Sequence, residues 1–107
     1  MKLEEKLGIK KELLIQIQKT FSKFKNVDRA VVFGSRARGD YKYNSDIDIA
    51  ILGEDITSKD FNSICDRLNQ LNTAFTFDVL NMKSISQKGL KDNIEREGIA
   101  IYDAEKS

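Results

Sequence analysis

The sequence predicts an α/β (α+β) domain, a small mixed β-sheet flanked by helices in the order α-β-loop-β-α-β-α-β. Three observations support this fold class. One short apolar run and two alternating segments are typical of strands, and apolar residues at helical spacing lie around them. The 107 residues suffice for one hydrophobic core, so we expect a single domain over 1–107 with its motif region at 27–80.

The N-terminal part predicts an amphipathic helix that ends near Asn26 and Asp28. Its apolar residues recur at spacings of four, four, four and three, and Lys and Gln occupy the other face. These apolar residues are Ile9, Leu13, Ile17, Phe21 and Phe24.

A buried strand over Ala30–Phe33 is predicted next, ending at Gly34. The polar segment from Gly34 to Ser45 predicts a loop with one helical turn after Gly34. Residues Asp46–Leu52 alternate and predict a second strand, with Asp46, Asp48 and Ala50 on one face and isoleucines on the other.

The second half continues with a helix, a strand, a helix and a strand. Thr57 and Asp60 have the spacing of a capping box at the start of the first helix. Alternation predicts a strand over Ala74–Leu80. Ser84 and Gln87 are candidate caps of the last helix, Gly98 is a candidate left-handed residue at its end, and Ile99–Tyr102 predicts a short final strand.

Composition excludes several function classes. The chain has no His and one Cys, Cys65, which excludes Ser-His-Asp and Cys-His catalysis, His-ligated zinc and an intrachain disulfide. With 18 basic and 17 acidic residues, the net charge of +1 gives no strong nucleic-acid signal. The remaining carboxylates, hydroxyls, Lys and Arg suit Mg²⁺ or Mn²⁺, which prefer oxygen ligands.

Targeting signals are also absent from the sequence pattern. No apolar run approaches the roughly 20 residues that span a bilayer, and residues 1–11 are charged throughout. We therefore expect a cytoplasmic protein without membrane contact.

The most informative motif is Asp46-Ile47-Asp48. Residues two apart in a strand point the same way, about 6.5 Å apart. Two carboxylates at this spacing can share a divalent ion, or bracket two ions roughly 3.5–4 Å apart. The alternative is a charged, solvent-facing strand, which the motif alone favours equally.

Asp78 shifts the balance towards chemistry. It lies in the next alternating segment, opposite Phe77 and Val79. If the two strands are neighbours, its carboxylate can reach the same site as a further metal ligand or as a base for an attacking hydroxyl. By itself, Asp78 would more often be a polar residue on a half-exposed strand.

The loop that begins with Gly34-Ser35 is a candidate phosphate-binding segment. Gly lets a phosphate approach backbone N–H groups, and Ser35 adds a hydroxyl. Arg36 and Arg38 add positive charge, but residues two apart on a helical turn point in different directions, so we expect one of them to reach a triphosphate. The alternative is a solvated basic loop. Gly34 and Gly39 have P-loop spacing, but Asp40-Tyr41 replaces the required Lys-Ser/Thr.

These motifs together resemble the signature of the DNA polymerase β-like nucleotidyltransferase superfamily, and most of all its minimal nucleotidyltransferases. The resemblance lies in Gly34 to Gly39 and Ser45 to Ile51, and extends over roughly Val27 to Tyr102. It implies a nucleotidyltransferase fold. It also implies metal-binding and catalytic roles for three acids and nucleotide binding by five further residues, among which it favours Arg38 over Arg36. The acids are Asp46, Asp48 and Asp78, and the nucleotide-binding set is Gly34, Ser35, Arg36, Arg38 and Ser45.

The resemblance also implies an activity and a partner. Members transfer a nucleoside monophosphate, commonly AMP from ATP, to a hydroxyl with two Mg²⁺ ions, and Mn²⁺ is an alternative. Minimal members often pair with a HEPN-domain toxin and add AMP to a toxin tyrosine, which makes them antitoxins. We therefore expect ATP or another NTP as substrate and a HEPN-type partner in a homo- or hetero-oligomer. A non-catalytic antitoxin that acts by binding, and a nucleotide or metal sensor, are the alternatives.

Overall fold

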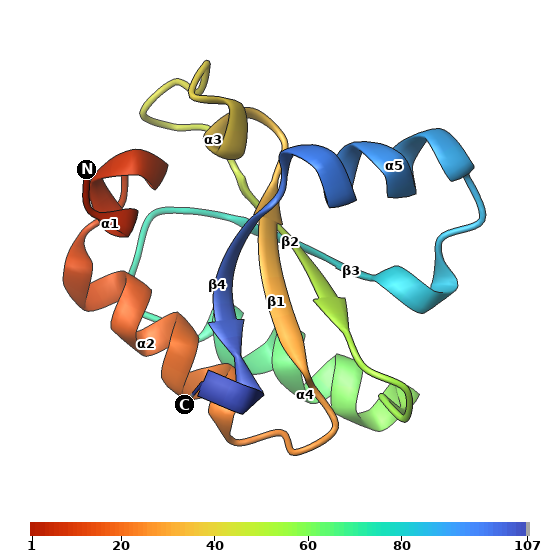
Figure 1. Cartoon of the computed structure of the whole chain (residues 1–107). Coiled ribbons are helices and arrows are strands. Elements are labelled where there is room, and N and C mark those ends of the chain that lie inside the picture. The colour runs from red at the N-terminus through yellow and green to blue at the C-terminus, as the bar shows by residue number, and fades with distance from the viewer. Residues whose placement is uncertain (107) are drawn as a thin grey trace.

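Four strands form one mixed sheet in the order β3-β2-β1-β4 (Figure 1). The computed structural model describes residues 1–106. The central strand β1 pairs antiparallel with both β2 and β4, whereas β2 pairs parallel with β3. The strands are β1 (Arg29–Phe33), β2 (Ile47–Leu52), β3 (Phe77–Asn81) and β4 (Ile99–Asp103).

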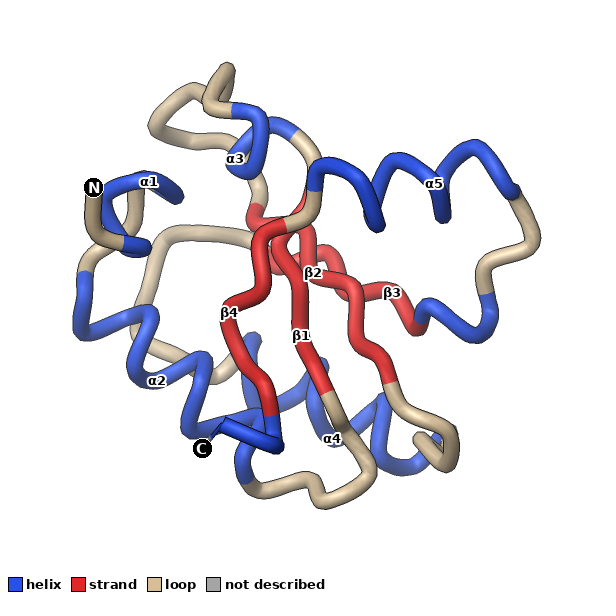
Figure 2. The backbone as a smooth tube through the Cα atoms, viewed as in Figure 1, coloured by secondary structure: helices blue, strands red, loops and turns tan. Residues whose placement is uncertain are grey.

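Helices cover both faces of this sheet, and Figure 2 shows how they alternate with the strands along the chain. Helix α4 connects β2 to β3, as a parallel pair requires, because such a pair needs a crossover. The predicted element order is confirmed. The helices are α1 (Leu3–Leu7), α2 (Lys11–Ser22), α3 (Ser35–Arg38), α4 (Ser58–Asn69) and α5 (Lys88–Glu97), with 3₁₀ turns η1 (Met82–Ser84) and η2 (Ala104–Lys106).

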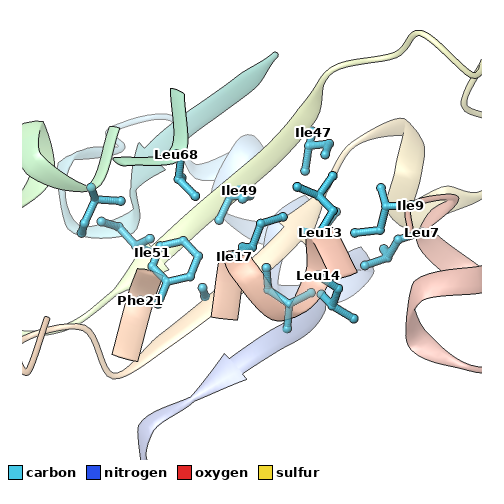
Figure 3. Packing of buried hydrophobic residues seen from close by; sticks show 14 of the residues in the cluster. Leu7, Ile9, Leu13, Leu14, Ile17, Phe21, Ile47, Ile49, Ile51 and Leu68 are labelled. Atoms are coloured by element: carbon cyan, nitrogen blue, oxygen red, sulfur yellow. The ribbon is translucent and has the colours of Figure 1, made fainter. Parts of the chain in front are cut away.

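The main core lies between one face of the sheet and helices α1, α2 and α4. Ile47, Ile49 and Ile51 of β2 are fully buried there and pack beside Ile17 and Phe21 of α2 (Figure 3). The other face carries a smaller apolar cluster under α5, which contains Val31, Ala50, Met82 and Ile94. The two faces of β2 therefore enter different environments, as its alternation predicts.

The single N-terminal helix that was predicted is instead two helices. Gly8 adopts φ 71°, a left-handed conformation that Gly reaches without steric cost, and it ends α1 before α2 begins. Ile9 and Phe24 are buried or partly buried but lie outside α2. The apolar spacing was correct for the packing face and wrong for the helix bounds.

The bounds of two strands also differ from prediction, and both strands begin later for a common reason. β2 begins at Ile47, not Asp46, and β3 spans Phe77–Asn81, not Ala74–Leu80. The Ile47 N–H donates to the Thr76 carbonyl over 2.9 Å, where the two strands first meet. Alternation extends further along the chain than the region in which a neighbouring strand is present.

The helix ends confirm one predicted cap and correct three other assignments. The capping box of α4 is present, with the Thr57 and Asp60 side chains each accepting a hydrogen bond from the other residue's backbone N–H. Gly98 does follow α5, but its backbone is extended, with φ −65°, rather than left-handed. Gly is required at this position because of limited space, since a Cβ would collide with the Val31 side chain and the Ile94 carbonyl. Gln87 is the residue before α5 but makes no side-chain cap, and Ser84 lies in η1.

None of the helices within residues 1–106 has the length and apolar character that crossing a membrane requires.

Candidate active site

Asp48 and Asp78 lie opposite one another on the neighbouring parallel strands β2 and β3. Residues paired in this way point to the same face, and neighbouring strands are about 4.8 Å apart. This face is the one opposite the main core, since Ile47 and Ile49 on either side of Asp48 are buried in that core. The structure therefore brings together two carboxylates that are 30 positions apart in the sequence.

Gly34 stands directly against the Asp48 carboxylate. Asp48 pairs with Phe33, the last residue of β1, so the next residue turns over the Asp48 side chain. Gly34 has φ 75° and ψ −151°, and a Cβ there would collide with the Asp48 Oδ2 atom. A side chain at this position would meet both backbone strain and a steric clash. The Gly-Ser turn and the acids thus form one site.

Asp46 contributes charge to this site from the loop that enters β2. It is exposed and lies one residue before the strand. The pKa of Asp48 is raised, first by burial and then by the negative charges of Asp78 and Asp46, while Arg38 opposes the shift. A bound cation would offset the repulsion among these carboxylates, because an opposite charge nearby favours the ionised form.

Arg38 lies at the rim of the site with its guanidinium accessible. Its side chain is 47% exposed and forms ion pairs of 3.4 Å with Asp40 and 4.0 Å with Glu97, at the end of α5. Such exposed pairs are weak and can be exchanged for a phosphate. Glu97 was not among the sequence-based candidates, because only the fold brings the end of α5 to this loop.

Arg36 lies in the interior, where it has no access to a nucleotide. It is 1% exposed, and its guanidinium donates to backbone carbonyls, among them that of Ser45 at 2.8 Å. The structure therefore separates the two arginines, placing Arg38 at the acids and Arg36 beneath the loop. The family resemblance favours Arg38, whereas residue types alone do not distinguish the two arginines, because the burial of Arg36 depends on carbonyls of other segments.

The two serines occupy different positions. Ser35 is the first residue of α3, beside Gly34, and is partly buried. Ser45 closes the turn before Asp46, where its hydroxyl accepts from the Lys42 N–H over 2.9 Å. The hydroxyl of Ser45 therefore bonds within its own loop, whereas Ser35 directly follows Gly34, the residue that stands against Asp48.

The donor set fits Mg²⁺ or Mn²⁺, although it does not form a closed cage. No three His, Cys, Asp or Glu side chains within residues 1–106 are arranged to hold one ion. Mg²⁺ is commonly held by one or two carboxylates together with phosphate oxygens and water. The crowding that raises the pKa of Asp48 fits such an open site, which a triphosphate would complete.

Comparisons with known proteins agree with this geometry. Residues 15–107 match the family described as polymerase beta, nucleotidyltransferase. A protein of Methanocaldococcus jannaschii, named as a protein adenylyltransferase, is 32% identical over 80 residues, which cover 70% of this chain and 79% of the relative.

Solved structures show the same fold. A chain of a toxin–antitoxin complex with AMP-PNP aligns with a TM-score of 0.66 at 20% identity, covering 89% of this chain and 74% of the other. A chain of the MntA–HepT toxin–antitoxin complex aligns with a TM-score of 0.66 at 18% identity, covering 91% and 75%. A chain of the complex of tri-AMPylated Shewanella oneidensis HEPN toxin with MNT antitoxin aligns with a TM-score of 0.64 at 18% identity, covering 89% of this chain and 73% of the other. With the match over residues 15–107 and the acids beside the Gly-Ser turn, the chain belongs to the polymerase β-like nucleotidyltransferase family.

Proposed function

We propose that this protein transfers AMP from ATP to a hydroxyl group on a HEPN-type partner protein and thereby acts as its antitoxin. The observation that carries the proposal is the register of Asp48 and Asp78 on adjacent strands, directly beside Gly34. The name of the archaeal relative and the complexes in which the neighbouring folds were solved support AMP and a HEPN partner.

The nucleotide would bind across the turn that connects β1 to α3. Gly34 leaves the backbone open, and the first N–H groups of a helical turn have no acceptor within the helix, so they can bind phosphate. Arg38 would exchange Asp40 or Glu97 for a triphosphate oxygen, since its guanidinium is exposed. Ser35 would add a hydroxyl donor. Arg36 is left out of the nucleotide-binding set because it is buried.

Asp46, Asp48 and Asp78 would hold Mg²⁺, or Mn²⁺, with the phosphates as additional ligands. When bound, two such ions neutralise charge on the attacking and leaving oxygens of phosphoryl transfer. The protein's part is to fix the spacing of the carboxylates, which the β2–β3 register does. Without a cation, burial and two neighbouring acids keep the pKa of Asp48 above its ordinary value.

Asp78 is the candidate base for the acceptor hydroxyl. It is exposed, whereas Asp48 is partly buried, so it lies on the side from which an acceptor can approach. The hydroxyl oxygen would form a bond to the α-phosphorus, the bond to pyrophosphate would break, and the proton would pass to the Asp78 carboxylate. The chain has no His for this role, and an ordinary Lys is protonated at neutral pH.

A label-transfer experiment tests the proposal. The protein is incubated with Mg²⁺, a HEPN protein encoded beside it and ATP labelled at the α-phosphate. We expect label on the HEPN protein at a tyrosine, and none with ATP labelled at the γ-phosphate. Asp48→Asn is the matched inactive control. Because the donor is ATP, we expect the reaction in the cytoplasm.

Two other results would replace the proposal. Tight HEPN binding without label would make the protein an antitoxin that acts by binding. Binding of Mg-ATP with neither transfer nor partner would make it a nucleotide sensor. Size-exclusion chromatography of the mixture gives the assembly, a homo- or hetero-oligomer, in the same preparation.

A further inference from the structure

The Arg36 side chain has every one of its donors occupied in the protein interior. Its guanidinium makes five hydrogen bonds to four carbonyls, matching the five N–H groups of an arginine. The acceptors, at 2.8 to 3.3 Å, are Leu7, Gly8, Tyr43 and Ser45.

Two aromatic rings flank this guanidinium. Its central carbon lies 4.8 Å from the ring centroid of Tyr41 and 4.6 Å from that of Phe75. Gly8 is packed against Tyr41 so closely that a Cβ on Gly8 would collide with the ring. The planar cation is therefore fixed by hydrogen bonds at its edge and by rings near its faces.

These contacts join the segments that lead into both acidic strands. The Ser45 carbonyl accepts two of the five bonds and immediately precedes Asp46. Phe75 lies three residues before Asp78, and Arg36 itself follows the Gly34-Ser35 turn. The Leu7 and Gly8 carbonyls add the junction of α1 and α2, which precedes the region matched by the family, residues 15–107. In Figure 1, α1 and α3 lie at the same end of the sheet.

We propose that Arg36 is a positioning residue that holds the loops of Asp46 and Asp78 in register with the phosphate-binding turn, and that it does so through the α1–α2 junction. This inference rests on the proposed function for its catalytic consequence. The proposal assigns the N-terminal helix a role in the site, since the α1–α2 junction supplies two of the carbonyls that bind the Arg36 guanidinium.

A buried arginine could instead contribute only to stability. Removing it would then lower the melting temperature, while the folded protein would bind metal and nucleotide as before. A positioning role predicts a different result, because Asp46 lies outside β2 and has no strand pairing that would hold it in place. Its placement depends on the 41–45 loop, which the guanidinium anchors at the Tyr43 and Ser45 carbonyls.

The test replaces Arg36 with Lys, which keeps the charge but has three donors on a point-like ammonium and no planar face. Arg67→Lys is the matched control, because Arg67 also stacks on an aromatic ring, 5.7 Å from the Phe24 centroid, but is exposed on α4. A second variant, Tyr41→Leu, removes one ring and leaves all four carbonyl acceptors of the five hydrogen bonds. Each protein is measured well below its own melting temperature.

For Arg36→Lys we expect the Mg²⁺ concentration at half-maximal transfer to rise about tenfold, as for loss of a residue that orients a metal ligand. Hydrogen–deuterium exchange should accelerate in residues 40–47 and 72–78 but not in α4. Tyr41→Leu should show the same pattern more weakly, and Arg67→Lys should show neither change.

Unchanged exchange in these two segments and an unchanged Mg²⁺ dependence in a folded variant would overturn the inference. If Arg36→Lys does not fold, Tyr41→Leu decides on the same two measurements. Failure of the unaltered protein to transfer AMP would count against the proposed function alone, because the exchange comparison does not depend on activity.

Discussion

The two faces of β2 differ in their roles: one packs in the main core, and the other carries an acid of the candidate site. Ile47, Ile49 and Ile51 are fully buried against α2 and α4. Asp48 lies between the first two isoleucines but points to the opposite face of the sheet, where it stands against Gly34 and next to Asp78 of β3. The isoleucine face lowers the free energy of the fold, whereas an ionised Asp48 raises it, because burial and two nearby acids disfavour its charge. Substitutions on the two faces should therefore have opposite signatures.

The largest effect is expected for Asp48→Asn. Removing this ligand charge should lower transfer by several orders of magnitude, since the site then holds a cation and its phosphates poorly. The melting temperature without Mg²⁺ should stay the same or rise, because the repulsion from Asp46 and Asp78 is relieved. Transfer assays and thermal melts on one preparation check this, and near-normal transfer by a stable variant contradicts the site.

Asp78→Asn should reduce kcat by about a hundredfold or more, as for loss of a general base, while Mg-ATP affinity stays within a few-fold. The interaction with the acceptor proton is made mainly in the transition state. Single-turnover rates and ATP titrations separate the two quantities. A well-folded variant with normal transfer would remove Asp78 from the catalytic residues.

Ile49→Ala should destabilise the fold by about 3 kcal/mol, the cost of a cavity in a packed core. Ile49 is 0% exposed and lies on the stability face of the same strand. Transfer per folded molecule should be unchanged, measured by urea unfolding and by activity corrected for the folded fraction. A loss of specific activity larger than the loss of folded protein would show that the two faces are coupled.

Arg38→Ala should raise the apparent KM for ATP by about tenfold, the equivalent of one charged hydrogen bond, with little change in stability. Its guanidinium is exposed and paired only with Asp40 and Glu97 among the ion pairs of residues 1–106. Arg67→Ala, on α4, is the control for general loss of positive charge. Equal KM values for the two variants would make the loop a solvated basic surface.

The smallest effect is a pH dependence of the metal-free protein. The pKa of Asp48 is raised in the fold, so its stabilising protonated form is fully present below the ordinary carboxyl range. That stability is lost as pH rises through the raised pKa. Melting temperatures across this range should fall more for the unaltered protein than for Asp48→Asn. Parallel curves would show that neither burial nor the neighbouring acids raise the pKa of Asp48 in the fold.

Local patterns predicted the element order and the alternation of β2 and β3. The two-residue period is a property of the chain itself, so Asp48 and Asp78 could each be assigned to the face of its own strand opposite the apolar residues before the pairing was known. The ends of strands depend on neighbours, which is why Asp46 was wrongly placed inside a strand. The sequence analysis could only assume that β2 and β3 are neighbours, and the structure shows that they pair.

Residue types alone could not predict the division between Arg36 and Arg38, which only the family resemblance favoured. Both arginines lie in one turn, and burial of the first depends on carbonyls at 7 and 8 and rings at 41 and 75. Such contacts are set by tertiary packing rather than by spacing along the chain. Gly8 shows the same limit, since its φ of 71° breaks an apolar period that otherwise continues.

The position of Asp78 on an outer strand also bears on self-association. Among residues 1–106, β3 pairs with β2 alone, and Phe77, Val79 and Leu80 are partly buried around the exposed Asp78. A row of free backbone groups on an apolar edge is a template for another chain, and a charged side chain discourages such pairing. An apolar substitution such as Asp78→Val would therefore create an aggregation-prone edge as well as an inactive site, so insolubility of that variant would reveal nothing about catalysis.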